Sequence, residues 1–254
     1  APELEVEETD FVDFDTKHRQ WKHLRAGDVW CMYDDEGLPR FYLHVTKVRD
    51  RGSGPGRSKT RVEGTWLETL ERAGRESEAG RVVTWGAFED GGSYLTDTMG
   101  EFAWNIGAAK ELKSGGKGSP GAGPEDAEVV EILPRAGEVW SVYTSPAAAE
   151  AGHKDVFCLR SLYLAEVLEV EGVERDLCST SGLACTSGRV KVRKMYKHAG
   201  WRHVYVPEEG EGGEVWVDLF QMGWHIPSHR LDPEVVDADV ACEGAMELDP
   251  ACLR

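Results

Sequence analysis

The stretch Ala-Gly-Asp-Val-Trp-Cys-Met-Tyr, residues 26–33, returns almost unchanged as Ala-Gly-Glu-Val-Trp-Ser-Val-Tyr at residues 136–143. A second pair follows, since Trp-Asn-Ile at 104–106 corresponds to Trp-His-Ile at 224–226. The two pairs are offset by about 110 and about 120 residues, so one unit occurs twice, with a small insertion in the second copy. The repeat predicts two related modules in tandem, and function is expected in features that both copies share.

The first copy has the alternation of apolar and polar residues that is typical of short strands. Residues 29–33 and 40–48 are expected to form a hairpin around a turn at 34–39 that contains Gly and Pro, and residues 60–67 and 81–88 predict two further strands. Together with the repeat, this pattern predicts an all-β fold with minor helix. We expect two tandem small β-barrel modules of the Tudor/SH3-like kind, joined by a flexible linker.

Composition divides the chain into four parts. Residues 1–9 are nearly all acidic or small and predict a mobile arm, and residues 10–107 are assigned to the first module. Residues 108–128 are rich in Gly and Pro, which is the composition of a flexible linker. Residues 129–254 are assigned to the second module with a C-terminal tail, and we expect the segment 247–250 to pack back on that module.

The chain is strongly acidic. Its 46 Asp and Glu residues against 29 Lys and Arg residues give a formal net charge of −17. A field of this sign repels phosphate backbones, so direct nucleic-acid binding is not expected, and a partner rich in Lys or Arg is favoured. The simpler interpretation, that the acidity serves solubility, stays open. No apolar run has transmembrane length, so no membrane partner is expected.

The cysteines and histidines do not predict a metal site or a catalytic centre. The six cysteines contain no Cys-x-x-Cys pair. Cys178, Cys185 and His198 are a weak candidate ligand set, and buried or loop thiols are the favoured interpretation. No nucleophile lies at a diagnostic spacing from a histidine, and no Gly-x-Ser-x-Gly or His-Glu-x-x-His motif occurs. We therefore expect no metal, no cofactor and no enzymatic activity.

Aromatic residues lie beside the predicted turns in both copies. Small barrels of the Tudor and chromo kind present several aromatic faces and a nearby carboxylate, which hold a methylated ammonium group by cation–π attraction. A pocket of this type is the predicted peptide-binding site. Its candidate residues are Trp30, Tyr33, Tyr42, Trp66, Asp34 and Asp35 in the first copy, and Tyr143, Tyr163 and Trp201 in the second.

Strand geometry predicts that these aromatic side chains do not all point to the same face of the sheet. Trp30 and Tyr33 are three positions apart, so on a regular strand their side chains point to opposite faces. We expect Trp30 and its counterpart Trp140 in the cores of the two modules, and the pair Tyr33 and Tyr42 at the surface. The alternative, in which all of these aromatic side chains are core residues, stays open.

Several strings resemble one known family. Asp-Phe-Asp at 13–15, Gly-Asp-Val-Trp at 27–30 and Thr-Trp-Leu-Glu at 65–68 are similar to the opening of the plant domain of unknown function 3444. Residues 226–231 and 246–251 resemble later parts of the same domain. That domain usually follows a J-domain in plant DnaJ-type proteins. The resemblance implies a link to nuclear co-activators, because some proteins of this type resemble co-activators that associate with readers of methylated DNA.

The sequence departs from the family pattern at two matching places. Phe-Ala-Trp at 102–104 and Met-Gly-Trp at 222–224 stand where the family has Phe-Ser-His, so no role of that Ser-His pair is carried over. A J-domain with its His-Pro-Asp motif is not among these residues, so stimulation of an Hsp70 partner is not assigned to them.

The residues and the resemblance together predict a non-enzymatic, reader-like module for protein interactions. We expect it to bind a basic peptide, with a methyl-lysine histone tail or another chromatin-associated protein as the candidate partner. Its expected role is transcription regulation in the nucleus. The alternative is a client- or co-chaperone-binding module of a DnaJ-type chaperone in the cytoplasm.

Overall fold

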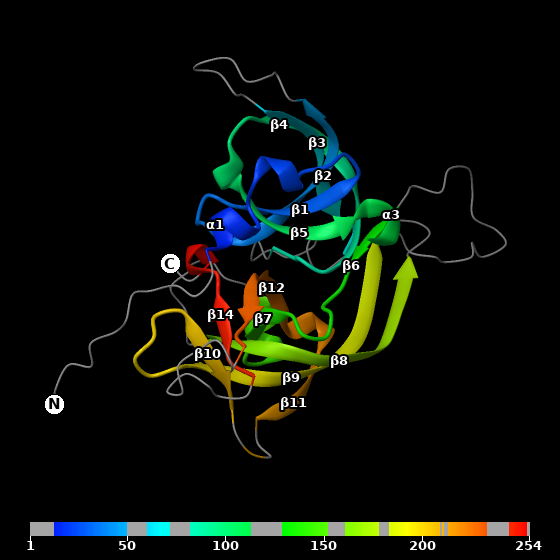
Figure 1. Cartoon of the computed structure of the whole chain (residues 1–254). Coiled ribbons are helices and arrows are strands. Elements are labelled where there is room, and N and C mark those ends of the chain that lie inside the picture. Colours follow the sequence, from blue (N-terminus) through cyan, green and yellow to red (C-terminus); the bar gives the residue numbers. More distant parts are fainter. Residues whose placement is uncertain are drawn as a thin grey trace.

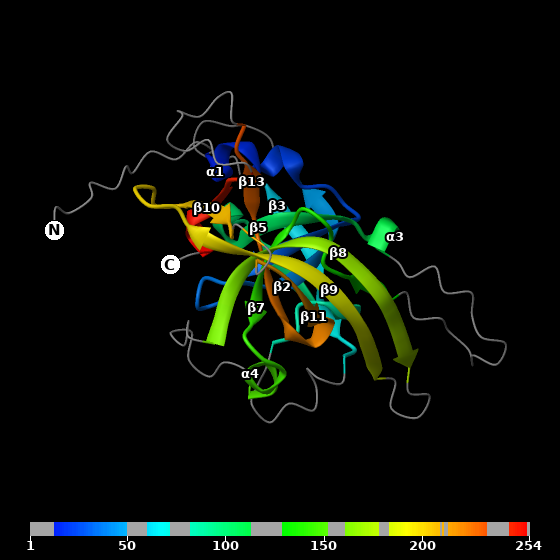
Figure 2. The same cartoon turned by 90° about the horizontal axis from the view of Figure 1, so that it is seen from below.

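The computed structural model describes residues 13–49, 60–71, 82–112, 129–151, 161–177, 183–208, 210, 213–232 and 244–252. The predicted acidic arm, residues 1–9, and most of the predicted linker, residues 113–128, lie outside these ranges. The described strands form two antiparallel sheets, which lie one above the other in Figure 1 and are seen from below in Figure 2. The predicted all-β, barrel-like fold class is thereby confirmed.

The first sheet has the strand order β5-β1-β2-β3-β4-β6. A 3-10 turn, η2 (Met99–Glu101), precedes its strand β5, and the short helix α3 (Ala109–Leu112) follows it. The strands are β1 (Asp28–Tyr33), β2 (Pro39–Arg49), β3 (Arg61–Thr69), β4 (Gly86–Thr96), β5 (Phe102–Ala108) and β6 (Val130–Ile132).

The second sheet has the order β12-β7-β8-β9-β10-β14-β13, with β11 also paired to β9. Its strands are β7 (Val139–Tyr143), β8 (Leu162–Leu177), β9 (Ala184–Lys197), β10 (Val204–Pro207), β11 (Glu214–Asp218), β12 (Met222–Ile226), β13 (Ser228–Arg230) and β14 (Met246–Leu248). The remaining short elements are α1 (Phe14–Lys17), η1 (Trp21–His23), α4 (Pro146–Ala151), η4 (Leu219–Gln221) and η5 (Pro250–Cys252).

The tandem repeat is visible in the strand order. The first sheet contains β5-β1-β2-β3-β4, and the second contains the corresponding series β12-β7-β8-β9 with β11 on β9. Gly27 and Gly137 adopt positive φ angles of 93° and 87°. Their N–H groups donate to the carbonyl oxygens of Val45 and Val167 at 2.7 and 2.8 Å. Because a side chain disfavours this backbone conformation, the repeated Ala-Gly string marks one turn that occurs in both copies.

The repeated tryptophans are core residues, as predicted. Trp30 and Trp140 are 1% and 2% exposed. Trp30 packs edge-on against Phe102 at 5.7 Å between ring centroids. The Trp140 indole donates to the Glu138 carboxylate at 2.9 Å, so its one polar atom is satisfied. Each tryptophan therefore anchors the core of its own copy.

The two copies interlock across the boundary that the sequence predicts. Strand β6 belongs by prediction to the second module, but it pairs with β4 and extends the first sheet. In the opposite direction, Trp85 from the first half lies in the core cluster of the second half. Its indole N–H donates to the Met222 carbonyl oxygen at 3.0 Å, and the neighbouring Thr84 hydroxyl donates to the Gly223 carbonyl. The halves thus share core residues and are not joined by a linker alone.

A buried carboxylate adds a second connection between the halves. The side chain of Glu71 is buried, with the residue 1% exposed, and the Glu71 backbone forms an isolated β-bridge with Ala184 at the start of β9. Its carboxylate accepts hydrogen bonds from the Ala87 N–H at 2.9 Å, and from the N–H and hydroxyl of Thr186 at 2.9 and 2.6 Å. A carboxylate in this position satisfies donors from both sheets, so we expect it to stabilise their contact.

The C-terminal tail packs as predicted and reaches further than predicted. Strand β14 pairs with β10 and β13 of the second sheet. The residues that follow it lie beside α1 of the first half, which Figure 1 shows as red next to blue. The tail therefore contacts both halves of the molecule.

Candidate peptide-binding site

The predicted aromatic pocket of the first copy does not form. Trp30 lies on one face of the first sheet, in the cluster with Phe102, and Tyr42 lies on the other, in the cluster with Phe88. Tyr42 is 1% exposed and donates its hydroxyl to the Thr84 carbonyl oxygen at 2.7 Å. The expectation that Tyr42 lies at the surface is wrong, because residues 83–88 and strand β6 cover that face of the sheet.

The aromatic candidates of the second copy are also separated. Tyr143 is buried on β7, which contradicts its predicted role in a surface pocket. Tyr163 is half-buried against the Trp140 cluster, where burial raises the pKa of its hydroxyl to about 12. Trp201 packs in a different cluster with Val204. These three residues therefore form no common pocket.

Tyr33, Asp34 and Asp35 do lie together, at the end of β1. The Asp34 carboxylate organises the turn, since it accepts from the N–H groups of Glu36 and Leu38 at 2.9 Å each and pairs with Arg40. Asp35 is exposed at the tip of the same turn. Asp34 thus shapes the turn, and the Asp35 carboxylate at its tip is exposed to a ligand.

The turn borders a cavity of about 960 Å³. Three segments that are distant in the sequence line it: the N-terminal segment with α1, the turn between β1 and β2, and the end of the chain after β14. Their lining residues are Asp13, Phe14, Asp15, Arg19, Tyr33, Asp35, Glu36, Gly37, Gly100, Asp249, Pro250 and Ala251. The cavity exists only because the tail returns to the first half.

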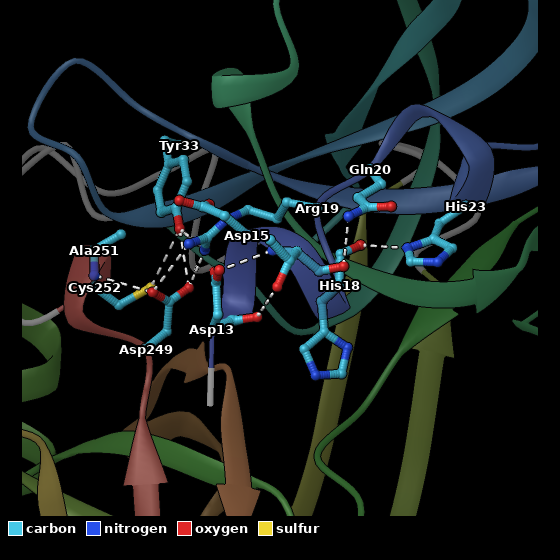
Figure 3. Close-up of polar contacts among 11 residues, drawn as sticks. Asp13, Asp15, His18, Arg19, Gln20, His23, Tyr33, Asp249, Ala251 and Cys252 are labelled. Carbon is cyan, nitrogen blue, oxygen red and sulfur yellow. Dashed lines mark hydrogen bonds and ion pairs between the residues drawn. The ribbon is translucent and has the colours of Figure 1, made fainter. Parts of the chain in front are cut away.

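A hydrogen-bonded network forms one wall of this cavity. Figure 3 shows Arg19 and Tyr33 converging on Asp249. Arg19 forms an ion pair with Asp249 and donates to the Tyr33 hydroxyl oxygen at 2.8 Å. The Tyr33 hydroxyl in turn donates to Asp249 at 3.1 Å. The side chains of Arg19 and Asp249 are 9% and 0% exposed, so this wall is preformed and rigid.

The network shifts the pKa values of Arg19 and Tyr33. Burial opposes the positive charge of Arg19, but the neighbouring Tyr33, Asp249 and Asp15 outweigh burial and raise the pKa of the guanidinium. Burial, followed by the nearby Cys252 thiol and Asp249 carboxylate, raises the pKa of Tyr33, so its hydroxyl stays protonated and can donate. Arg19 therefore stays positively charged and the Tyr33 hydroxyl stays protonated over the ordinary pH range.

The cavity as a whole is negative. Five carboxylates line it, and Arg19 is the one basic residue among the lining residues. Arg19 is already paired with Asp15 and Asp249. Asp15 and Glu36 are ion-paired with Arg19 and Arg40, and Asp35 is an exposed lining carboxylate for which no ion pair to a described residue is recorded. The five carboxylates still outnumber the one lining guanidinium, so the cavity presents net negative charge to a ligand.

Sequence reasoning missed Arg19 and Asp249. They lie 230 positions apart, and no local pattern marks two such residues as partners. The only available signal was the expectation that segment 247–250 packs back on the second module. Trp66, the remaining predicted residue, lies away from this cavity and contacts Phe41 and Tyr94.

In the part of the chain that the structure describes, neither a metal-ligand cluster nor a membrane-spanning helix is found. Among those residues, no group of three or more His, Cys, Asp or Glu side chains is placed to hold a metal ion. Cys178 of the weak candidate set lies outside the described ranges. None of the described helices has the length and apolar character needed to cross a bilayer.

Fold and cavity define an all-β protein of two interlocked barrel-like copies, with an acidic cavity where its two ends meet. The family model for the domain of unknown function DUF3444 matches residues 1–234, and the chain belongs to this family. The match ends before the resembling segment 246–251, so Asp249 lies beyond it. No curated protein and no solved structure matches the chain.

Proposed function

We propose that this chain is a non-enzymatic, reader-like interaction module that binds a basic peptide in the acidic cavity. One observation carries the proposal: five carboxylates line a cavity of about 960 Å³, and its one lining guanidinium is already paired. A Lys or Arg side chain entering beside Asp35 and Asp15 would gain charge-assisted hydrogen bonds. The overall charge of −17 would also speed its approach by long-range attraction.

The proposed partner is a histone tail or another basic chromatin-associated protein, and the proposed place of action is the nucleus, in transcription regulation. Histone tails carry the positive charge that the cavity requires. The same negative field disfavours direct contact with nucleic acid.

Two observations support binding rather than catalysis. Cys31 and Cys252 are buried thiols, and the Cys252 Sγ lies 3.9 Å from the Tyr33 hydroxyl in the wall of the cavity. Burial raises the pKa of both thiols, so neither is a reactive thiolate at neutral pH. Tyr33 is similarly held protonated and is committed to Asp249. These groups position the wall of the cavity.

A calorimetric titration with a Lys- and Arg-rich peptide tests the proposal. The variant Asp15→Asn/Asp35→Asn removes two exposed carboxylates from the cavity and should weaken binding about tenfold or more, as expected for two charge-assisted contacts. The matched control is Glu169→Gln/Glu174→Gln, which removes two exposed carboxylates from β8 and leaves the cavity intact. Equal weakening in both variants would mean that binding follows net charge alone, which would contradict the proposed site.

The second candidate function is client or co-chaperone binding in a DnaJ-type context. The observation that favours it is Phe41, a large apolar side chain that is 44% exposed. This function predicts that the chain suppresses aggregation of an unfolded client, and that neutral apolar peptides bind as well as basic ones. Binding that requires positive charge on the peptide would exclude it.

A further inference from the structure

A second cavity, distinct from the acidic one, opens on the first sheet. It has a volume of about 590 Å³. At its mouth the rings of Phe41 and Trp66 meet at an interplanar angle of 67°, with their centroids 6.2 Å apart. We call this pair the aromatic corner. Tyr94 supports it, since its ring lies 4.4 Å from that of Trp66.

The cavity exists because two strands separate. The last paired residues of the β2–β3 ladder at this end are Leu43 and Trp66. Strand β2 begins four residues earlier at Pro39, and β3 continues to Thr69, so both strands extend beyond their last pair. At this separation the Phe41 side chain is 44% exposed. Leu67, Val83 and Phe88 form the apolar floor.

One carboxylate at the rim is available to a cation. Glu68 lines the cavity and is exposed, and no hydrogen bond or ion pair to another described residue is recorded for it. Arg40, the basic residue of the lining, is paired with Asp34 and Glu36. The aromatic corner therefore combines two ring walls with one negative charge that no described basic residue neutralises.

We propose that the aromatic corner binds the methylated ammonium group of a lysine in the peptide, which rests on the proposed function and assigns it a second subsite. A di- or trimethylated ammonium keeps its charge, so it is attracted to the two ring faces and to Glu68. Methylation removes N–H donors that an apolar cavity could not satisfy. An unmodified ammonium would lose hydration there and recover a single hydrogen-bonded partner, so it is disfavoured.

This site differs from the aromatic pocket that the sequence predicts. Trp66 belongs to both, but the second wall is Phe41 and not Trp30 or Tyr42, which are buried. The carboxylate is Glu68 and not Asp34, which is engaged in its own turn. The two cavities are also assigned different ligands. Unmodified basic side chains are assigned to the acidic cavity, and the methylated lysine side chain is assigned to the aromatic corner.

The test compares three forms of one basic peptide by calorimetry: unmodified, trimethylated at a lysine, and carrying a neutral tert-butyl isostere of trimethyl-lysine. The trimethylated form should bind about tenfold more tightly than the other two, in line with a cation–π contribution at a partly desolvated site. Phe41→Ala should remove this gain and leave the affinity for the unmodified peptide unchanged. Leu95→Ala, which truncates another exposed apolar side chain of the same sheet, should keep the gain.

The outcomes separate this inference from the proposed function. Equal affinity for all three forms would overturn the methyl-lysine site and leave basic-peptide binding in place. A gain that the tert-butyl form shares would show apolar docking without cation recognition, and would also overturn it. Absence of binding by every form would contradict both proposals. Loss of the gain in Glu68→Gln, with the fold intact, would support the assigned role of that carboxylate.

Discussion

The Tyr33 hydroxyl donates a hydrogen bond of 3.1 Å to the Asp249 carboxylate, although the two residues lie 216 positions apart in the chain. Arg19 contacts both of them. This contact joins the first strand of the first copy to the tail of the second. It makes the acidic cavity a product of the whole chain, so its integrity should depend on the fold of both halves.

Removing the Tyr33 hydroxyl should therefore destabilise the protein without creating a cavity in its hydrophobic core. Tyr33→Phe keeps the ring and leaves Arg19 and Asp249 with one partner fewer, which is expected to lower the free energy of unfolding by about 1–3 kcal/mol. Chemical denaturation measures the change. Tyr163→Phe is the control, because no hydrogen bond to a described residue is recorded for the Tyr163 hydroxyl. A loss of the same size in the control would mean that ring packing, and not the network, is responsible.

Glu71 should matter more than an exposed carboxylate on the same part of the chain. Glu71→Ala leaves the buried N–H groups of Ala87 and Thr186 without their acceptor. The expected loss is about 2–5 kcal/mol in the free energy of unfolding, since two or more buried donors become unsatisfied. Glu63→Ala removes a partly exposed ion pair with Arg49 and should cost less than about 1 kcal/mol. Similar denaturation midpoints for the two variants would contradict the connecting role of Glu71.

Stability should decrease in mild acid because of a buried histidine. His225 packs between Trp104 and Trp140, and burial lowers the pKa of its imidazole, partly opposed by Glu138. The unfolded chain then binds a proton more readily than the native one. Stability should hold above a pH of about 6.5 and fall below it, by at most about 1.4 kcal/mol per pH unit from this group.

His225→Asn provides the comparison, because Asn105 occupies the matching register position in the first copy, opposite Trp30. Denaturation curves between pH 5 and pH 8 should show a weaker dependence on pH in the variant. Burial also lowers the pKa values of His18 and His229, so part of the dependence should remain. An unchanged slope in His225→Asn would exclude His225 as the cause.

Peptide binding at the acidic cavity should weaken with salt. The carboxylates of Asp15 and Asp35 are exposed, so their attraction to a basic peptide is screened by ions. Raising ionic strength from about 0.05 M to about 0.5 M should lower affinity roughly tenfold or more. The additional gain from lysine methylation should change much less, because ring contacts are short-ranged. Affinity that does not respond to salt would contradict an electrostatic cavity.

Local patterns in the sequence predicted the repeat, the strands and the two core tryptophans. The Ala-Gly-Asp/Glu-Val-Trp string combines a glycine needed for positive φ with a tryptophan on the buried face, and both are consequences of neighbouring residues. Tyr33 and Asp35 were predicted to lie near a ligand for a similar reason, since they belong to one turn.

Long-range packing could not be predicted in the same way. Tyr42 was expected at the surface, but the face that carries it is covered by Phe88 and by strand β6, which comes from the other half. The exposure of Phe41 could not be predicted from the sequence, because it depends on where the β2–β3 ladder ends. Arg19 and Asp249 have no sequence signal that pairs them. Each of these positions is fixed by a contact between distant segments.

Chemical-shift mapping of the ¹⁵N-labelled chain with an unmodified Lys- and Arg-rich peptide locates the peptide-binding surface. Binding in the acidic cavity predicts saturable shifts of the Tyr33, Asp35, Gly37 and Ala251 amides, which come from both ends of the chain and meet only in the folded protein. These shifts should be lost in Asp15→Asn/Asp35→Asn. Saturable shifts confined to the β8–β9 strands, or no shifts at all, would contradict the account.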